Sequence, residues 1–423
     1  MSEWKEYKLK DVATLTTGFP FDGHKYCKEG IRVVRGDNVT IGSLRWNADK
    51  DKRWSESFER ATEYSLYAGD IVIGMDGSRV GKNRAQVKKE DLPLLIAQRV
   101  ACVRHNELSL QSFLYYHIFS DSFEQYIKAV QTGTSIPHIS LKQIGEFSIV
   151  LPPRAIQDKI VSILKSLDDK IEVNRRINDN LEQQAQALFK SWFVDFEPFK
   201  NGEFVDSELG RIPKGWKLTY ISEIIHVLET GRRPKGGVGE IKGGIPSVGA
   251  EHIKGIGNYD YSKTKYINEE FASSLKTGKI KGYELLIYKD GGKPGYFIPN
   301  YSIFGEGYPF EECFLNEHVF KLDFGDKGYN AFCYFYFHTD YVMNYLNAQG
   351  GKAAIPGINK QDVENILVFA PENEVVMKFS KFVLPLIKQI LMNCNESRRL
   401  AELRDTLLPK LMSGELKVSE INM

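Results

Sequence analysis

The sequence predicts an α+β protein in which two similar mixed α/β domains are joined by two long helices that form an antiparallel coiled coil. The first observation is a repeat: "SIPHISLKQIGEFSIVLPP" from Ser135 returns as "AAIPGINKQDVENILVFAP" from Ala353. The second is that a long amphipathic segment follows each copy, and the third is that prolines precede both segments. Together they give the order globule, helix, globule, helix, with an internal pseudo-two-fold repeat.

The repeat covers most of the chain. An offset of 219 relates Arg99 to His318 as well as the two quoted stretches. Farther upstream the offset shrinks to 214, where "DGSRVG" from Asp76 matches "DGGKPG" from Asp290 and "IRVVRGDNV" matches "IPSVGAEHI". The register slips only where a loop could absorb a few residues, and the period is far too long for a solenoid. One structural unit is therefore used twice.

The two amphipathic segments carry apolar residues at the three- and four-residue spacing of a long helix. Each helix should hold about 38 residues and extend roughly 57 Å at 1.5 Å per residue. A two-fold axis between the copies would make the helices antiparallel, and each would bury the stripe of the other. The expected interface is one heptad position in each helix: Ile160, Leu167, Asn174, Leu181, Leu188, Phe379, Leu386, Asn393, Leu400 and Leu407.

Two polar residues interrupt this stripe at equivalent places, Asn174 and Asn393. If they face each other, their amides can hydrogen-bond and fix the register of the coiled coil. The alternative is that both face solvent where the stripe drifts. Pro409 lies inside the expected second helix, which should therefore kink or end there.

These patterns divide the chain into five parts. We expect a first domain over residues 1–151, a long spacer helix within 152–199, a second domain over 200–371, a second spacer helix within 372–415 and a short tail over 416–423. The two heads would then be held at a fixed separation. Such geometry suits a protein that reads two DNA half-sites on one duplex, and it also suits a two-headed protein-binding adaptor without a nucleic-acid role.

Composition and motifs exclude several classes of protein. No apolar run reaches the roughly 18 residues of a membrane span, and the N-terminus lacks the apolar core of a secretion signal, so we expect a cytoplasmic protein with no membrane partner. The five cysteines are scattered, without a CxxC pair, which predicts neither a disulfide framework nor a zinc site.

Catalytic motifs are also missing. A DNA amino-methyltransferase would show a Pro-Pro-aromatic motif, but Pro152-Pro153 is followed by Arg154. "GMDGSRVGKNR" departs from a phosphate-binding loop because Asp76 occupies the position of the first glycine and Asn83 that of the hydroxyl residue. A self-sufficient DNA-modifying enzyme is therefore the least favoured of three hypotheses.

The stretch "LFKSWFVDFEPF" from Leu188, then "SELGRIPKGWK" from Ser207 and "LRDTLLPKLMSGELKV" from Leu403, resembles the specificity subunit of bacterial type I restriction-modification enzymes. The resemblance extends over nearly the whole chain. It implies that each globule is a target recognition domain for one half of a bipartite, asymmetric sequence in double-stranded DNA. It further implies a non-catalytic chain whose coiled coil sets the spacing and docks two methyltransferase subunits, and through them the restriction (translocase-nuclease) subunits.

The resemblance also implies that the chain itself binds no cofactor or metal, and that S-adenosylmethionine, ATP and Mg act on the partner subunits. The net charge of the two domains does not directly support DNA binding. Residues 1–150 carry 21 lysines and arginines against 19 carboxylates, and residues 207–371 carry 19 against 19. Since phosphate neutralisation dominates non-specific DNA affinity, the positive charge must gather on one face or the partners must contribute to binding.

Candidate DNA contacts lie in polar, glycine-rich loops, where arginine suits the edge of guanine and asparagine that of adenine. Any one of them could instead be an ordinary solvated loop residue. In the first domain they are Arg35, Asn38, Ser78, Arg79, Lys82, Asn83, Arg84, Thr134 and Ser135. In the second domain they are Arg232, Arg233, Lys235, His252, Lys293 and Lys352. Because the two sets differ, the two half-sites should differ in sequence.

Overall fold

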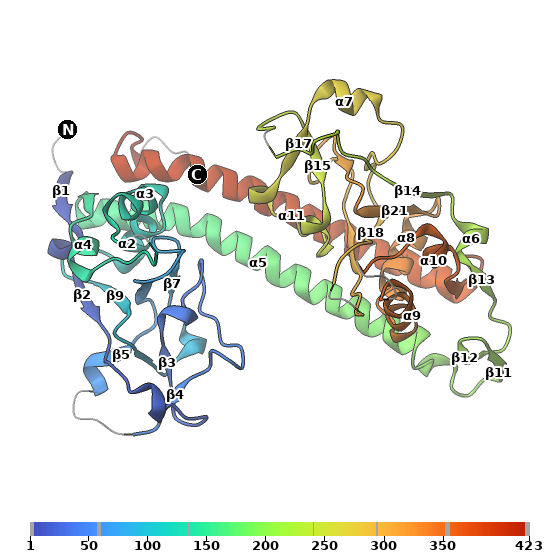
Figure 1. Cartoon of the computed structure of the whole chain (residues 1–423), viewed down its shortest axis with the longest axis horizontal. Coiled ribbons are helices and arrows are strands. Elements are labelled where there is room, and N and C mark those ends of the chain that lie inside the picture. Colours follow the sequence, from blue (N-terminus) through green and yellow to red (C-terminus); the bar gives the residue numbers. More distant parts are fainter. Residues whose placement is uncertain are drawn as a thin grey trace. The chain divides into compact units, whose positions relative to one another are not determined.

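The chain folds into two compact units, each of which takes residues from both long helices (Figure 1). The computed structural model describes residues 4–56, 61–133, 135–239, 241–292, 295–351 and 356–418. Unit 1 holds the chain up to Asp168 together with the residues from Ala401 onward, and unit 2 runs from Asp169 to Leu400. We call the globular part of unit 1, up to Leu151, head 1, and that of unit 2, from Phe204 to Phe369, head 2.

Head 1 is built on two small sheets and a terminal strand pair. One sheet has the order β2-β9-β6-β7 and is antiparallel throughout, and the other has the order β4-β3-β8-β5 with β3 and β8 parallel. The strands are β1 (Lys5–Lys8), β2 (Ala13–Thr17), β3 (Ile31–Val34), β4 (Arg53–Trp54), β5 (Ser65–Leu66), β6 (Ile71–Gly74), β7 (Arg84–Gln86), β8 (Leu94–Ile96), β9 (Val100–His105) and β10 (Ser148–Leu151). The α-helices are α1 (Leu9–Val12), α2 (Gln111–Ile118), α3 (Asp121–Val130) and α4 (Leu141–Gly145).

Head 2 repeats this plan with additions. Its larger sheet has the order β14-β21-β18-β19-β16, and its smaller sheet β17-β15-β20 keeps one parallel pair, β15 with β20. The strands are β11 (Phe204–Ser207), β12 (Gly210–Pro213), β13 (Leu218–Tyr220), β14 (Val227–Thr230), β15 (Ile245–Val248), β16 (Gly255–Ile256), β17 (Lys265–Ile267), β18 (Leu285–Tyr288), β19 (Asn300–Ile303), β20 (Phe314–Leu315), β21 (Val319–Asp323) and β22 (Leu367–Phe369). The helices are α6 (Ile221–Ile224), α7 (Glu269–Ser274), α8 (Lys327–Tyr336), α9 (Asp340–Gly350) and α10 (Lys360–Glu364).

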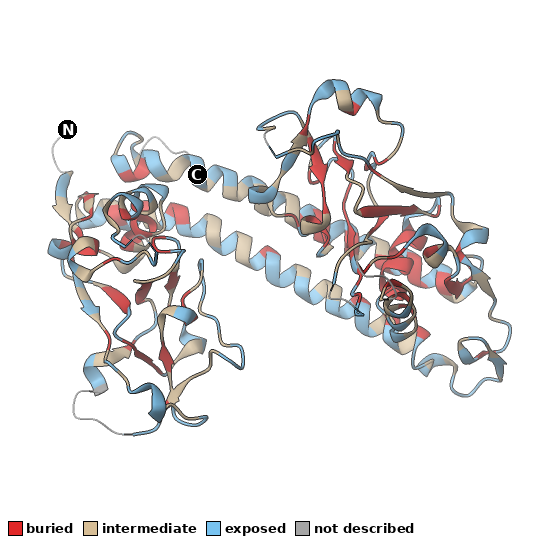
Figure 2. Ribbon diagram, viewed as in Figure 1, coloured by how far each residue is buried: buried red, intermediate tan, exposed pale blue. Residues whose placement is uncertain are grey.

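The internal repeat is thus visible strand by strand. The terminal pair β1·β10 of head 1 corresponds to β13·β22 of head 2, and both pairs are antiparallel. The central strands β6 and β18 are short apolar runs that are almost wholly buried, as Figure 2 shows by their colour. Burial on both faces explains why these strands lack the alternating pattern of a half-exposed sheet. The predicted α+β class and duplicated architecture are confirmed.

The two spacer helices are α5 (Arg154–Phe193) and α11 (Glu374–Ser413), each of 40 residues. Both begin just after the prolines that the sequence placed before them, and both fall inside the expected ranges. α11 runs through Pro385 and Pro409. Of the two alternatives for Pro409, a kink or an end, the helix does not end there, because a proline removes one helical hydrogen bond but the surrounding turns persist.

The helices pack against each other antiparallel within each unit. In unit 2, Phe379 from the start of α11 contacts Phe189 and Phe193 from the end of α5 at ring distances of 5.5 and 5.4 Å. In unit 1, Asp168 of α5 forms an ion pair at 2.7 Å with Arg404 near the end of α11. The predicted stripe residues Ile160, Asn174, Phe379 and Asn393 are buried, and Leu167, Leu181, Leu188, Leu386, Leu400 and Leu407 are half-buried.

The two stripe asparagines are buried, which rules out the solvent-facing alternative. Their side-chain amides do not hydrogen-bond to each other, although Nδ2 of Asn174 donates to the backbone carbonyl of Asn393 at 3.5 Å. Asn393 donates instead to Oδ1 of Asn178 at 2.8 Å, and Asn174 donates to Oε2 of Glu396 at 2.7 Å. Each buried amide is satisfied by a neighbour from the facing helix, so the pair still specifies the local register.

Candidate nucleic-acid interface

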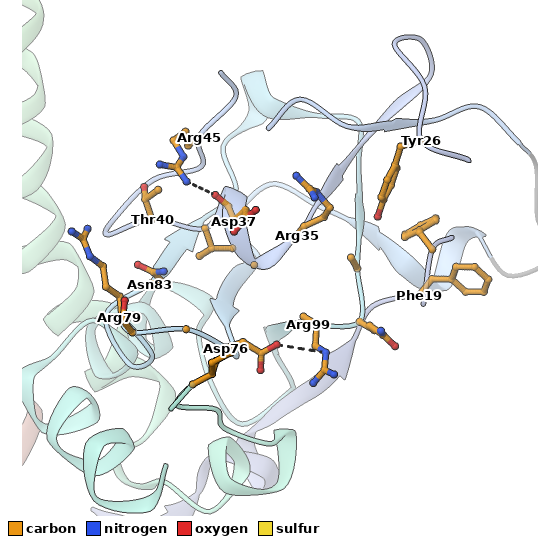
Figure 3. A pocket seen from close by; sticks show the side chains of 18 residues that line it. Phe19, Tyr26, Arg35, Asp37, Thr40, Arg45, Asp76, Arg79, Asn83 and Arg99 are labelled. Atoms are coloured by element: carbon orange, nitrogen blue, oxygen red, sulfur yellow. Dashed lines mark hydrogen bonds and ion pairs between the residues drawn. The ribbon is translucent and has the colours of Figure 1, made fainter. Parts of the chain in front are cut away.

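Head 1 carries a groove of about 670 Å³ at the ends of its two sheets (Figure 3). Five segments line it: the segment after β2, the turn after β3, the glycine loop (residues 75–83) after β6, the turn before β9 and Ile136 before α4. Polar and charged side chains from these loops point into the groove from several sides. Such a wide, polar hollow is suited to an extended, charged ligand.

Backbone hydrogen bonds hold these loops in place. The amide of Met75 donates to the carbonyl of Arg99 at 3.1 Å, and the amide of Gly77 donates to the carbonyl of Pro137 at 3.0 Å. The glycine loop is therefore fixed on one side to the turn before β9 and on the other to the "SIPH" segment. Gly77 has a φ of +104°, a left-handed conformation that glycine adopts without steric cost.

Four arginines line the groove, against two aspartates. Arg99 forms an ion pair with Asp76 at 3.5 Å, and Arg45 donates to the backbone carbonyl of Asp37 at 2.9 Å. A hydrogen bond from Lys50 to Asp37 keeps the pKa of that carboxyl below its usual range. The groove is therefore electropositive although head 1 as a whole is nearly neutral.

Arg35 is the most enclosed of the four arginines. Its guanidinium carbon lies 5.7 Å from the centre of the Tyr26 ring, a cation–π distance. Its Nε atom is buried, and none of the described residues offers it a hydrogen bond. A buried donor without a partner costs free energy unless a ligand supplies an acceptor. Arg35 is thus placed to receive an anionic or carbonyl oxygen.

The structure brings four of the predicted head 1 residues together in this groove: Arg35, Ser78, Arg79 and Asn83. Ser135 is exposed and adjoins Ile136, which also lines the groove. Lys82 is exposed but pairs with Glu124 of α3 at 3.6 Å and does not line it. Thr134, Lys293 and Lys352 lie outside the described residues.

Three of the predicted contacts, Asn38, Arg84 and His252, have side chains that are buried within the protein. Asn38 donates to the carbonyls of Arg45 and Lys50 at 3.0 and 2.9 Å and so closes a turn. Arg84 donates to the carbonyl of Ile118 at 2.6 Å, and its burial lowers its pKa.

His252 occupies in head 2 the place of Asn38. It stacks on Tyr259 at 4.2 Å, and burial lowers its pKa. In all three cases the polar side chain hydrogen-bonds to the protein or packs against it. Sequence alone does not distinguish such a residue from an exposed loop residue.

In head 2 the predicted cations lie in the segment after β14. Arg232, Arg233 and Lys235 are exposed, and a hollow of about 430 Å³ is lined by residues 233–237. Arg233 pairs with Glu317 at 2.6 Å, and Glu317 also lies 3.2 Å from Nε2 of His318. In head 2, charged side chains that follow β14 therefore pair with side chains that precede β21.

The sequence reasoning missed several groove residues, among them Arg45, Arg99, Gln98, Phe19 and Tyr26. A signal for Arg99 was present, because the repeat aligns it with His318, the last residue before β21. The aromatic residues carried no such signal, since exposed and buried aromatics look alike in a single sequence.

In the described part of the chain, histidines, cysteines and carboxylates form no group of three or more that could hold a metal ion. No helix among the described residues is both long and apolar enough to cross a membrane.

Comparisons with known proteins agree on one family. Residues 1–183 match the model described as "Type I restriction modification DNA specificity domain". The chain is 30% identical to the MjaIX type I restriction enzyme specificity subunit of Methanocaldococcus jannaschii, over 99% of this chain and 95% of the relative. It is 26% identical to the HindI specificity subunit of Haemophilus influenzae, over 98% and 100%. The crystal structure of a type I system S subunit from M. genitalium shares the fold, with a TM-score of 0.54 at 16% identity and coverage of 97% and 96%.

Proposed function

The chain belongs to the type I restriction enzyme specificity subunits, and we propose that each of its heads reads one half of a bipartite, asymmetric DNA sequence. The observation that carries this proposal is the arginine-lined groove of head 1, set on a frame that head 2 repeats. Arginine is the side chain best suited to both phosphate and the guanine edge. The chain itself is non-catalytic in this proposal.

The long helices would act as the spacer between the two half-sites and as the docking surface for the methyltransferase subunits. Two copies of that subunit are expected, because the duplicated heads and helices offer two similar surfaces. The restriction subunits would join through them. The buried Asn174 and Asn393 support a spacer role, because polar contacts in a coiled coil favour one register over its neighbours.

The test uses the full chain assembled with its methyltransferase subunits. Sequencing of methylated DNA gives the recognised motif, and binding to duplexes in which one half-site is scrambled then measures the contribution of each head. We expect either scrambled half to abolish specific binding, and an added base pair in the spacer to do the same.

A second measurement separates this proposal from the protein-adaptor alternative. The affinity of the complex for its duplex should fall linearly with salt on a double-logarithmic plot, because phosphate contacts release counterions. Replacing Arg35, Arg45 and Arg79 together with alanine should reduce that slope, whereas Lys10→Ala, outside the groove, should not. A complex that shows no sequence preference, or that binds DNA equally without this chain, would refute the proposal.

A further inference from the structure

One pair of side chains in the groove has a counterpart in the other head. Arg99 is the residue before β9 and His318 the residue before β21, and each accepts a backbone hydrogen bond from the loop after the central strand, from Met75 and Lys289 at 3.1 and 3.0 Å. The aspartate that follows in each loop then turns toward this residue. The geometry is the same on two independent copies of the frame.

The side-chain contact is also repeated. Asp76 pairs with Nε of Arg99 at 3.5 Å, and Asp290 pairs with Nδ1 of His318 at 2.8 Å. The Arg99 side chain is 64% exposed, and no hydrogen bond from the described residues engages its two terminal nitrogens. Asp76 therefore orients the guanidinium from behind and leaves the outer edge of the fork free in the groove (Figure 3).

This arrangement distinguishes Arg99 from Arg79. Arg79 lies at the exposed tip of the glycine loop, and the described residues offer its guanidinium no partner. Ordering a free arginine costs conformational entropy, whereas an arginine already oriented loses less on binding. A bidentate contact to the O6 and N7 atoms of guanine requires a planar fork in a fixed orientation. Arg99, which Asp76 holds at one nitrogen, comes closer to this requirement than Arg79.

We infer that Arg99 reads a guanine in the half-site bound by head 1, donating from its terminal nitrogens to O6 and N7, and that Asp76 is the positioning residue. The inference rests on the proposed function and makes it more specific. It assigns one base contact to a residue that precedes a core strand. Position 318 is the equivalent reading position in head 2, where histidine and the neighbouring Glu317 present different chemistry.

The experiment replaces each guanine of the first half-site, one at a time, with 7-deazaguanine, which lacks the N7 acceptor. The full chain assembled with its methyltransferase subunits is titrated with each duplex. We expect the wild-type complex to lose about tenfold in affinity at one guanine. Arg99→Ala should bind the natural duplex roughly 5- to 150-fold more weakly and should no longer respond to the substitution at that guanine.

Three further variants separate base reading from charge and from stability. Arg99→Lys keeps the charge but not the fork, so it should recover non-specific affinity without recovering the response to 7-deazaguanine. Asp76→Asn should weaken the response at the same guanine, and in the Arg99→Ala background it should have no added effect. Lys10→Ala, whose side chain pairs with Glu146 outside the groove, should behave as wild type.

Two results would overturn the inference while leaving the proposed function intact. One is a wild-type complex that binds specifically but whose first half-site contains no guanine. The other is an Arg99→Ala complex that keeps the wild-type response at every guanine. A wild-type complex without any sequence preference would instead refute the proposed function itself.

Discussion

In head 1, Gly18 follows strand β2, and in head 2 the equivalent Gly231 follows strand β14. The sequences of the two heads differ after this glycine. A Cβ on Gly18 would lie 2.0 Å from the carbonyl oxygen of Ile96, and a Cβ on Gly231 would lie 1.5 Å from that of Leu315. After this glycine, head 1 continues with Phe-Pro-Phe and head 2 with Arg-Arg-Pro. The close approach of two backbones fixes the glycine in both heads, and it leaves the following side chains free to differ.

The divergent side chains have different surroundings. In head 1, Phe21 packs 4.9 Å from Trp54 and 5.1 Å from Phe19, so the segment joins an aromatic cluster beside the groove. In head 2, Arg232 is exposed and Arg233 pairs with Glu317. The backbone contact at the glycine and the side chains that follow it are thus under separate physical constraints. The side chains after this glycine can therefore differ without a change in how the head folds.

The largest expected effect tests the shared frame. Gly18→Ala and Gly231→Ala should each lower the free energy of unfolding by more than about 3 kcal/mol, because the new methyl group meets backbone that cannot move aside. Thermal or urea unfolding measures this loss. The matched controls are Gly23→Ala and Gly239→Ala, where a Cβ meets no atom within 4 Å. Equal stability of all four variants would show that the backbone approach does not exclude a methyl group at either Gly18 or Gly231.

A second prediction uses a buried histidine of head 1 whose equivalent in head 2 is a tyrosine. His117 of head 1 corresponds to Tyr336, and burial lowers the pKa of His117 to about 4. Because its folded pKa lies below its unfolded value, the unfolded state takes up the proton first as pH falls. Head 1 should therefore lose up to about 3 kcal/mol of stability between pH 6.5 and pH 4, and none from this group above pH 6.5.

Hydrogen exchange read separately for each head measures this loss. His117→Tyr should remove the acid-dependent part of the head 1 profile, whatever its effect at neutral pH. Strands β18 and β21 of head 2, followed in the same sample, should show the same acid profile in the wild-type and the variant chain. An unchanged acid profile in the variant would assign the sensitivity of head 1 to another group.

The smallest expected effect concerns the divergent segments themselves. Replacing Arg232, Arg233 and Lys235 with alanine should weaken DNA binding of the assembled complex by about tenfold and lower its salt slope by about 0.9 for each phosphate that is no longer neutralised. Replacing Phe19 and Phe21 with alanine should leave the slope unchanged, because no charge is removed. Fluorescence titration at several salt concentrations measures both, and equal slopes for the two variants would contradict the difference between the heads.

The architecture was predictable because a repeat and a helical period are one-dimensional signals. The offset of 219 places β10 over β22 and α4 over α10, and the apolar spacing located both spacer helices. The sequence left two alternatives at Pro409, a kink or an end of the helix, because a proline can be tolerated in a long helix or can terminate it. The repeat at offset 214 places β16 over Ile41, where head 1 has only an isolated bridge to Arg84, so the same position forms a strand in one head and a single bridge in the other.

The candidate site was predictable only in part. The glycine loop was located through its composition, and three of its residues, Ser78, Arg79 and Asn83, do line the groove. Asn38 and Arg84 belong to the same quoted stretches but turn inward to hydrogen-bond backbone carbonyls. The direction of a side chain depends on the loops packed around it, and a single sequence does not contain that information.

The division of the molecule into units has a consequence for its synthesis. The final turns of α11 bring Leu411 and Met412 into the core of unit 1, and Gly414 lies against the ring of Trp4 at the start of the chain. The first head leaves the ribosome early, yet its core is closed only by residues translated after all of unit 2. A nascent or prematurely terminated chain therefore exposes the apolar surface that those last residues cover, and chaperones and proteases can distinguish it from a finished one.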